Sequence, residues 1–296
     1  MICPLCHQTN DDAAERCACG FRFVVATNEL PDWFNAIRSL LENSYLAAET
    51  PWQQSGKSGP FEEWVRLRIP ISECVETSGT FLDIGCANGF LLECLLDWAM
   101  RKGVRIEPYG VDYSPKLAAL ARQRLQGFAE NIFVGNAWDW QPPLRFDYVR
   151  TEVCYVPMNL AAAYISRLLA DFLVPGGKLL VAQYRSRRED LSGDWIDDYL
   201  SRLGFSVRGS KSGFSGDGLE LTRVAVLQRW RARATCDSRR GGWAHGEANL
   251  CQQSRKPVAW ITSGGFVPLA RGHSAQRRTS KPLLTCRVCW QPAVWK

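Results

Sequence analysis

Short apolar runs alternate with amphipathic segments between Gly79 and Trp230, and this alternation limits the fold more than any other feature of the chain. The runs predict strands near residues 80–84, 106–112, 131–135, 146–151, 177–184, 204–209 and 220–229, and the amphipathic segments predict helices near 89–101, 114–126, 160–173 and 193–203. This spacing favours an α/β fold with a mostly parallel, doubly wound sheet. Only the turn-rich stretch GSKSGFSGDG separates the last two strands, which indicates a hairpin with an antiparallel final strand at or beside the sheet edge.

The rest of the chain divides into three regions by composition. Residues 1–25 are rich in cysteine, residues 30–78 combine a clear helix with a polar connector, and residues 231–296 lose all periodicity. The helix begins near Pro31-Asp32 and either packs on the neighbouring domain or covers a ligand cleft as a lid. The connector PWQQSGKSGP predicts a loop, which a second helical piece follows from Phe61 to about Cys74.

Charge separates the tail from the rest of the chain. Residues 231–296 hold 12 Lys and Arg against 2 acids, whereas residues 1–230 hold 24 against 28. The predicted folded part is therefore mildly acidic, which argues against the basic stripe of a nucleic-acid enzyme. No apolar run approaches the roughly 20 residues of a membrane helix, and no secretory signal begins the chain. The 12 cysteines therefore indicate the reducing cytoplasm, with thiols that bind metal or are buried.

The stretch FLDIGCANGF, residues 81–90, predicts a buried strand that ends in an acid and a glycine turn. Gly85 and Gly89 suit a turn with positive φ or a close approach of ligand to backbone. Ligands bind at the carboxyl ends of strands in open α/β sheets. The dinucleotide fingerprint has a second glycine where this chain has Ala87, which disfavours a nicotinamide oxidoreductase.

A second acid, Asp112, ends the next predicted strand 23 residues after Gly89. An acid at this place accepts hydrogen bonds from both ribose hydroxyls, so the turn and the acid together predict a nucleoside site. Asp112 alternatively caps the following helix, although Ser114 is the more natural cap.

Five segments in this order and spacing resemble the class I S-adenosylmethionine-dependent methyltransferases: FLDIGCANGFLLE, PYGVDYSP, NIFVGNAWDW, RFDYVRTEVCYVP and LVPGGKLLVAQY. The resemblance covers about residues 79–230. It implies a seven-stranded sheet with helices on both faces and an antiparallel edge hairpin. The domain organisation that follows is a zinc-ribbon-like segment at 1–25, a helical linker or lid at 30–78, the S-adenosylmethionine-binding domain at 79–230 and a basic, disordered tail at 231–296.

The resemblance also assigns roles to residues. The methionine end of the cofactor is held by the glycine turn, that is Asp83, Gly85, Cys86, Ala87 and Gly89. The adenosine is held by Asp112, Tyr113, Asn136 and Ala137, with Asn136 standing where many relatives have Asp. Arg150, Thr151 and Glu152 line the cleft beyond the fourth strand, and Thr151 also counts among the cofactor-binding residues.

Methyl transfer from a sulfonium is an in-line displacement, which depends on the alignment of donor and acceptor. A base is required only for a protonated acceptor, and the candidates are Glu152 and Tyr155. Alternatively, Glu152 binds cofactor or solvent and Tyr155 is a packed wall. The segment TEVCYVP lacks the Asn/Asp-Pro-Pro-aromatic pattern of enzymes that methylate exocyclic amines of bases, and Cys154 suits a buried thiol. The acceptor is therefore expected to be a small molecule. Trp52, Trp138 and Trp140 form an aromatic wall for it or pack in the core.

Cys3, Cys6, Cys17 and Cys19 supply four thiolates on two short turns, which predicts a tetrahedral structural zinc site, with His7 as a spare ligand. A segment this short has no hydrophobic core, so the metal supplies its folding energy. The knuckle CPLCHQ is also similar to that of a group of ribosomal RNA guanine methyltransferases, so RNA is the alternative acceptor.

Two further alternatives remain open. A nonenzymatic module that binds cofactor and zinc would share these residues without transferring a methyl group. In the tail, Cys286 and Cys289 with Cys236 and Cys251 allow a second metal site, although disorder is the default for this composition.

Overall fold

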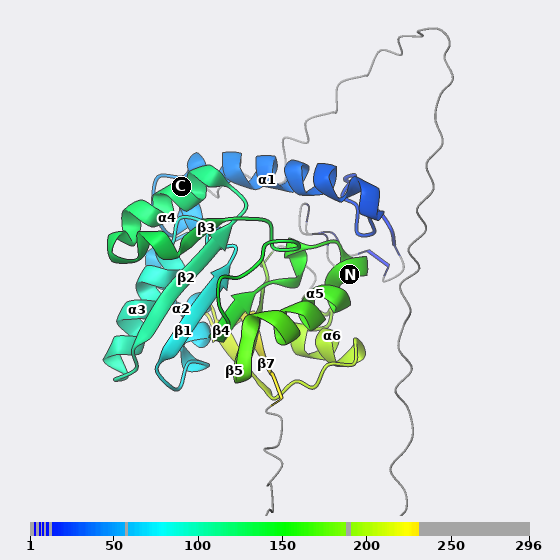
Figure 1. Ribbon diagram of the computed structural model, residues 1–296. Helices are drawn as coiled ribbons and strands as arrows, with labels where there is room; N and C mark the ends of the chain where they lie inside the picture. The colour runs from blue at the N-terminus through cyan, green and yellow to red at the C-terminus, as the bar shows by residue number, and fades with distance from the viewer. Residues whose placement is uncertain are drawn as a thin grey trace, which may run out of the picture. The chain divides into compact units, whose positions relative to one another are not determined.

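Seven strands form one mixed sheet in the order β3-β2-β1-β4-β5-β7-β6 (Figure 1). Their bounds are β1 Gly79–Ile84, β2 Ile106–Asp112, β3 Ile132–Val134, β4 Phe146–Thr151, β5 Leu173–Tyr184, β6 Gly209–Phe214 and β7 Glu220–Gln228. The first five strands are parallel, and β7 pairs antiparallel with both β5 and β6. The expected doubly wound, seven-stranded sheet with an antiparallel hairpin at its edge is confirmed, and β7 lies next to the edge strand β6. The computed structural model describes residues 3, 6, 8, 10, 11, 14–56, 59–187 and 191–230.

Helices cover both faces of the sheet, because the strands alternate apolar side chains between two cores. One core lies under α2 (Phe61–Glu73), α3 (Phe90–Arg101) and α4 (Pro115–Arg124). The other lies under α5 (Ala161–Arg167) and α6 (Ile196–Arg202) and continues into the cysteine-rich segment. Alternation along β1 sends Phe81 and Leu82 to opposite cores, as strand geometry requires.

The carboxyl ends of the parallel strands carry the expected turn and acids. The helix α4 begins with Ser114, whose hydroxyl accepts a hydrogen bond from the Leu117 N–H at 3.2 Å. Ser114 is therefore the N-cap, which leaves Asp112 available for another role.

Four expected elements differ from the structure. Residues 204–208 are not a strand, because α6 ends in a turn through Gly204 and the edge strand begins only at Gly209. The stretch GSKSGF, expected as the hairpin loop, is itself β6. The strand β5 begins at Leu173 rather than 177, because Leu173 already pairs with Phe146 before a bulge. The helix expected at 160–173 is α5 followed by a turn of π-helix, η6 (Leu168–Phe172).

A long helix, α1 (Leu30–Leu46), precedes the sheet and runs across the molecule above α4 in Figure 1. Its first turn buries Trp33 and Phe34, and Trp33 donates a hydrogen bond to the Arg22 carbonyl at 3.1 Å. None of the helices in the described ranges is both long and apolar enough to cross a membrane.

Candidate functional site

The glycine turn after β1 has the strained backbone that the sequence indicates. Gly85 and Gly89 both have φ +75°, and Ala87 has φ +47°, where a side chain is uncommon. A Cβ on Gly85 would lie 2.6 Å from the Tyr155 ring, and one on Gly89 would lie 3.0 Å from the Ala121 Cβ. Gly85 therefore permits close approach of Tyr155, while Gly89 permits close packing of α3 on α4.

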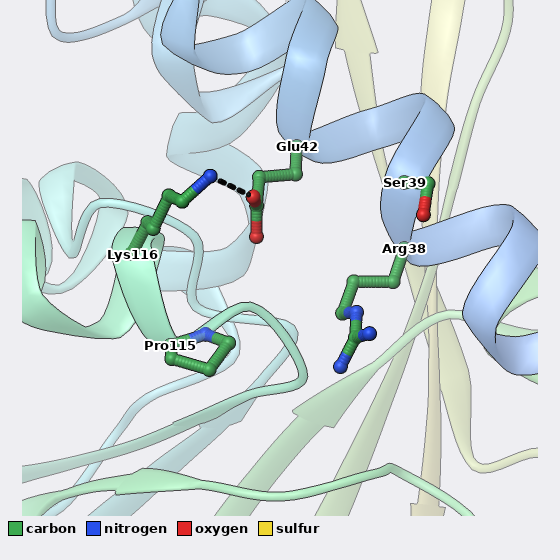
Figure 2. A pocket seen from close by; sticks show the side chains of 5 residues that line it. All are labelled: Arg38, Ser39, Glu42, Pro115 and Lys116. Carbon is green, nitrogen blue, oxygen red and sulfur yellow. Dashed lines mark ion pairs between the residues drawn. The ribbon is translucent and has the colours of Figure 1, made fainter.

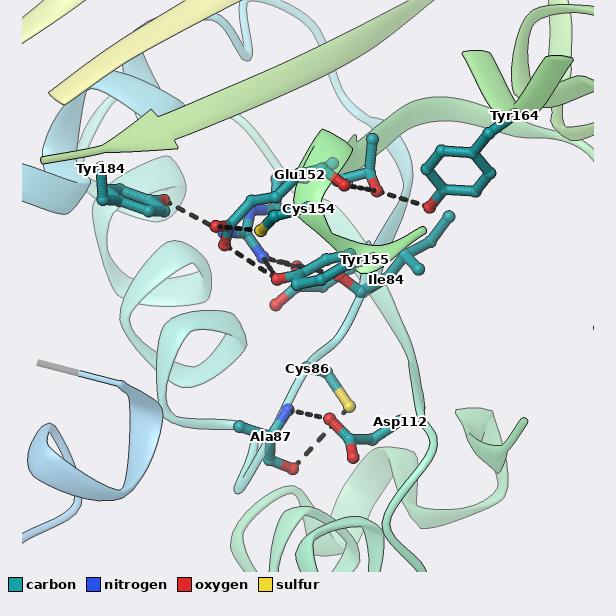
Figure 3. A network of polar contacts seen from close by, with 12 residues as sticks. Ile84, Cys86, Ala87, Asp112, Glu152, Cys154, Tyr155, Tyr164 and Tyr184 are labelled. Atoms are coloured by element: carbon teal, nitrogen blue, oxygen red, sulfur yellow. Dashed lines mark hydrogen bonds and ion pairs between the residues drawn. The ribbon is translucent and has the colours of Figure 1, made fainter. Parts of the chain in front are cut away.

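The second acid is tied to this turn. Asp112 Oδ2 accepts the Ala87 N–H at 2.8 Å (Figure 3). Its Oδ1 accepts the Ser114 N–H at 2.8 Å. A carboxylate offers about four lone-pair positions, so each oxygen keeps capacity for one further donor. This geometry fits an acid that accepts two ribose hydroxyls. The Cys86 side chain, by contrast, is buried beside Gly110, so Cys86 can meet a ligand only through its backbone.

The end of β3 contributes the adenine side of the expected site. Asn136 Oδ1 accepts the Trp138 N–H at 2.8 Å, so its Nδ2 is the atom left to donate to a ligand. Ala137 is half-buried beside it. The chain is held to β2 by a hydrogen bond from the Gly135 N–H to the Asp112 carbonyl at 3.0 Å. The structure thus brings the expected adenosine residues to one end of β2 and β3.

Helix α1 covers this adenosine side. The Tyr113 hydroxyl donates to Asn35 Oδ1 at 2.9 Å, and the Arg38 guanidinium lies 4.7 Å from the Tyr113 ring centroid. Glu42 accepts the Ser114 hydroxyl at 2.5 Å and pairs with Lys116 at 2.8 Å. These contacts show that α1 packs on Tyr113 and the start of α4, which is compatible with both expected roles of the helix, packing on the domain and covering a ligand cleft.

A surface hollow of about 280 Å³ lies between α1 and the start of α4 (Figure 2). It is lined by Arg38, Ser39, Glu42, Pro115 and Lys116. None of the residues expected to bind the methyl donor or the acceptor lines this hollow, so it lies outside the expected site.

A buried arginine organises the ends of β1 and β4, and three of its partners, Glu152, Tyr155 and Tyr184, are labelled in Figure 3. Arg150 is 4% exposed and donates through Nη1 to Asp83 Oδ1 at 3.1 Å and to the Tyr155 hydroxyl at 3.0 Å. Through Nη2 it pairs with Glu152 Oε1 and donates to the Tyr184 hydroxyl at 3.2 Å. One guanidinium therefore fixes two acids and two phenols.

The two candidate bases lie within this network. The Tyr155 hydroxyl donates to Glu152 Oε1 at 2.8 Å, and the Cys154 thiol lies 3.6 Å from Oε2. Burial raises the pKa of Tyr155 well above its usual value, so its phenol stays protonated at neutral pH. Of the two, only Glu152 keeps an oxygen, Oε2, without a strong donor among the described residues.

Thr151 departs from the expectation that it lines the cleft. Its side chain is fully buried, and its hydroxyl is hydrogen-bonded to the Tyr164 hydroxyl at 2.6 Å. The reason is strand alternation: Tyr148 and therefore Arg150 point to the α2–α4 face, whereas Val149 and Thr151 point to the α5 face. Only the Thr151 backbone remains for a ligand.

Burial perturbs both acids of the site. It raises the pKa of Asp83 to about 6, although Arg150 opposes the rise. It also raises the pKa of Asp112 to about 6, although hydrogen bonds from the Ser114 and Ala87 backbone oppose the rise. Such shifts on acids at strand ends are typical of functional sites.

Three residues at this site escaped the sequence-based reasoning. Tyr45 of α1 is half-buried, and its pKa is raised by desolvation and then by the charges of Glu152 and Asp112. Tyr184 ends β5 and contacts Arg150. Arg68 of α2 is 5% exposed, with its guanidinium 3.5 Å from the Tyr184 ring centroid. The signal for Arg68 was present, because it occupies an apolar-face position between Trp64 and Ile71.

The tryptophans serve packing. Trp140 contacts the Phe133 and Phe172 rings, and Trp52 contacts Phe61 and Phe90. The loop that carries Trp52 also touches the glycine turn, because Asn88 Nδ2 donates to the Pro51 carbonyl at 2.9 Å.

The four cysteines of the N-terminal segment converge. Their Sγ atoms all lie within 4.8 Å of one another, with Cys3–Cys19 at 3.6 Å and Cys6–Cys17 at 3.4 Å. A tetrahedral zinc ion with Zn–S bonds of about 2.3 Å places its sulfurs about 3.8 Å apart, so this donor set fits zinc. His7 and the tail cysteines lie outside the described residues.

The cysteine segment is joined to the loop after β4. The Met158 N–H donates to the Phe23 carbonyl at 2.8 Å. The Asn159 amide bonds both the N–H and the carbonyl of Val25, at 3.2 and 3.1 Å. The segment therefore supports the same loop that carries Glu152.

Comparison with known families gives one match, in which residues 81–177 fit a family described as a methyltransferase domain. These residues are about a third of the chain and include Asp83, the glycine turn, Asp112 and the β4 end. Comparison with curated proteins gives no match.

Several solved structures are similar. One is the Burkholderia thailandensis 1,6-didemethyltoxoflavin-N1-methyltransferase with bound 1,6-didemethyltoxoflavin and S-adenosylhomocysteine, at 15% identity and TM-score 0.49 over 70% of this chain and 92% of that one. Another is the N-methyltransferase NodS from Bradyrhizobium japonicum with S-adenosyl-L-homocysteine, at 18% identity and TM-score 0.44 over 64% and 97%. A third is a Haloferax volcanii putative methyltransferase in complex with the Trm112 activator, at 18% identity and TM-score 0.43 over 57% and 91%. These likenesses are distant.

Proposed function

We propose that the protein, whose residues 81–177 match a family described as a methyltransferase domain, transfers a methyl group from S-adenosylmethionine to a small-molecule acceptor. The observation that carries the proposal is the carboxylate of Asp112, which is fixed by the Ala87 and Ser114 N–H groups and keeps one acceptor position on each oxygen. A ribose with two free hydroxyls is the ligand that this arrangement suits.

The other residues proposed to bind S-adenosylmethionine lie at the same end of the sheet. Asp83 and the backbone of Gly85 to Gly89 hold the amino-acid end of the donor, and Cys86 and Ala87 contribute through their backbone. Tyr113, Asn136 and Ala137 hold the adenine, and α1 closes over them. The bound donor supplies an activated methyl group, and the protein's part is to align it with the acceptor and to exclude water.

For an acceptor that must lose a proton, Glu152 is the proposed base. Its Oε1 is held by Arg150 and Tyr155, which fixes the carboxylate in one orientation. Its Oε2 then faces the acceptor side and accepts the proton. Tyr155 acts in the proposal as a positioning residue, because its raised pKa keeps the phenol protonated.

The experiment incubates the purified full-length chain with S-adenosylmethionine that carries an isotopically labelled methyl group. A cell extract, separated into a small-molecule fraction and an RNA fraction, supplies the acceptor. We expect a labelled product. Mass spectrometry should find the label in a small molecule. Label confined to ribosomal RNA would support the alternative acceptor instead. Binding of S-adenosylhomocysteine without label in either fraction would favour a nonenzymatic binding module.

The cysteine segment is proposed to hold one structural zinc ion through Cys3, Cys6, Cys17 and Cys19. We expect about one zinc per chain by metal analysis of protein purified under reducing conditions. Cys17→Ser should lose most of it, because three thiolates hold the ion far less well than four. Cys94→Ser, outside the cluster, serves as the control and should retain full zinc. Wild-type protein without zinc would contradict this assignment.

A further inference from the structure

The buried cation Arg68 has no counter-ion in the described part of the chain. It is 5% exposed, its Nη1 atom has no hydrogen-bond partner there, and no acid forms an ion pair with it. The neighbouring Arg150 differs, because Asp83 and Glu152 neutralise it. An unpaired buried charge costs several kcal/mol. A contribution to the stability of the fold therefore does not explain why an arginine occupies this buried position.

The surroundings of Arg68 offer further hydrogen-bond donors, and the carboxylate of Asp83 interacts with its charge only from beyond ion-pair distance. Its guanidinium stacks on Tyr184 at 3.5 Å. Thr222 pairs directly across from Tyr184 in the β5–β7 ladder, so both side chains stand on the sheet face that α2 covers. The Thr222 hydroxyl is also buried without a partner among the described residues. Two unpartnered donors beside one aromatic ring suit an anionic oxygen group.

We propose that Arg68, with Tyr184 and Thr222, binds an anionic group, carboxylate or phosphate, on the methyl acceptor. The inference rests on the proposed methyl transfer and adds the class of its substrate.

Position in the sheet assigns the anion to the acceptor rather than to the donor. Tyr184 ends β5, which is separated from β1 and its glycine turn by β4. Neighbouring strands lie about 4.8 Å apart, so Tyr184 is displaced by roughly 10 Å from the strand that precedes the donor turn. Between them stands Arg150, with Glu152 on the loop that follows. Across the sheet, the glycine turn that binds the methyl donor is therefore followed by the proposed base Glu152 and then by the proposed anion-binding group around Arg68.

The experiment compares the full-length wild type with Arg68→Met, Arg68→Lys and the control Arg66→Met. Arg66 lies on the same helix, but its side chain is 50% exposed and pairs with Glu63. The labelled small-molecule product should be retained on an anion exchanger. Arg68→Met should lower kcat/KM by about tenfold or more through KM, because a charge-assisted hydrogen bond is lost. Arg68→Lys should recover part of the loss, and Arg66→Met should match the wild type.

Binding assays separate the two sources of the anion. S-adenosylhomocysteine carries the amino-acid carboxylate, and 5′-methylthioadenosine lacks it. If Arg68→Met leaves both affinities unchanged while acceptor KM rises, the anion belongs to the acceptor as proposed. If it weakens only S-adenosylhomocysteine, the subsite binds the donor carboxylate and the acceptor assignment is overturned. A neutral product, or Arg68→Met with wild-type KM, also overturns it. Failure of the wild type to bind S-adenosylhomocysteine would instead refute the proposed function.

Discussion

Asp112→Ala is expected to weaken S-adenosylhomocysteine binding by at least about a hundredfold. The wild-type carboxylate offers one free acceptor position on each oxygen, and a hydrogen bond to a charged group contributes about 1.5–3 kcal/mol. Losing two such bonds removes about 3 kcal/mol or more, which corresponds to two or more powers of ten in Kd. Isothermal titration calorimetry on the purified chain measures the change. Asp97→Ala, on the exposed face of α3, is the matched control and should bind like the wild type.

The pH dependence gives this prediction a second measurement. The pKa of Asp112 in the ligand-free protein is raised to about 6 by burial. The protonated acid has one acceptor fewer, so affinity should rise from pH 5 to 7 and level off above. Asp112→Asn should remove much of this increase in affinity between pH 5 and 7. The part of the increase that is due to Asp83, whose pKa is also about 6, should persist. Equal affinity of Asp112→Ala and wild type, in protein with normal circular dichroism, would rule out Asp112 as the ribose ligand.

Much of the fold was predictable from the sequence because local patterns and the global topology agree. Apolar runs that end in acids or turn residues, followed by amphipathic helices, specify a parallel sheet almost without ambiguity. The failures lie where pairing overrides local preference. The stretch GSKSGF has the composition of a loop, yet it pairs with β7 along its whole length. The sequence pattern places Leu173 at the end of a predicted helix, yet in the structure it belongs to β5 and pairs with Phe146 of β4.

The candidate site divides in the same way. Asp83, Gly85, Gly89 and Asp112 lie in contiguous segments, so their meeting at one sheet edge follows from the strand order. Arg68 and Tyr45 come from helices outside the sheet, and only tertiary packing brings them to it. The prediction that the Thr151 side chain lines the cleft was wrong for a different reason. Both faces of β4 are buried, so the sequence does not reveal which alternate residues of the strand face the cleft.

Arg150→Met is expected to lower the free energy of unfolding by about 3–5 kcal/mol, the usual cost of removing one partner of a buried ion pair. Arg150 is 4% exposed and Asp83 is 1% exposed, so water cannot replace the lost guanidinium. Tyr155 and Tyr184 lose a hydrogen-bond partner in the same step. Urea unfolding followed by circular dichroism measures the loss. Arg223→Met is the matched control, because its pairs with Glu220 and Asp197 are partly exposed and should contribute much less.

The loss should also depend on pH, with a sign that identifies its origin. Arg150 opposes the upward shift of the Asp83 pKa, so its removal raises that pKa further above 6. An acid whose pKa is higher in the folded state destabilises the fold when it ionises, and stability falls as pH rises from about 4 through the folded-state pKa. The deficit of Arg150→Met should therefore be larger at pH 8 than at pH 5. Adding Asp83→Asn removes the buried charge and should recover part of the stability at pH 8 only. A deficit that is equal at both pH values would mean that Arg150 stabilises the protein through packing rather than by neutralising Asp83.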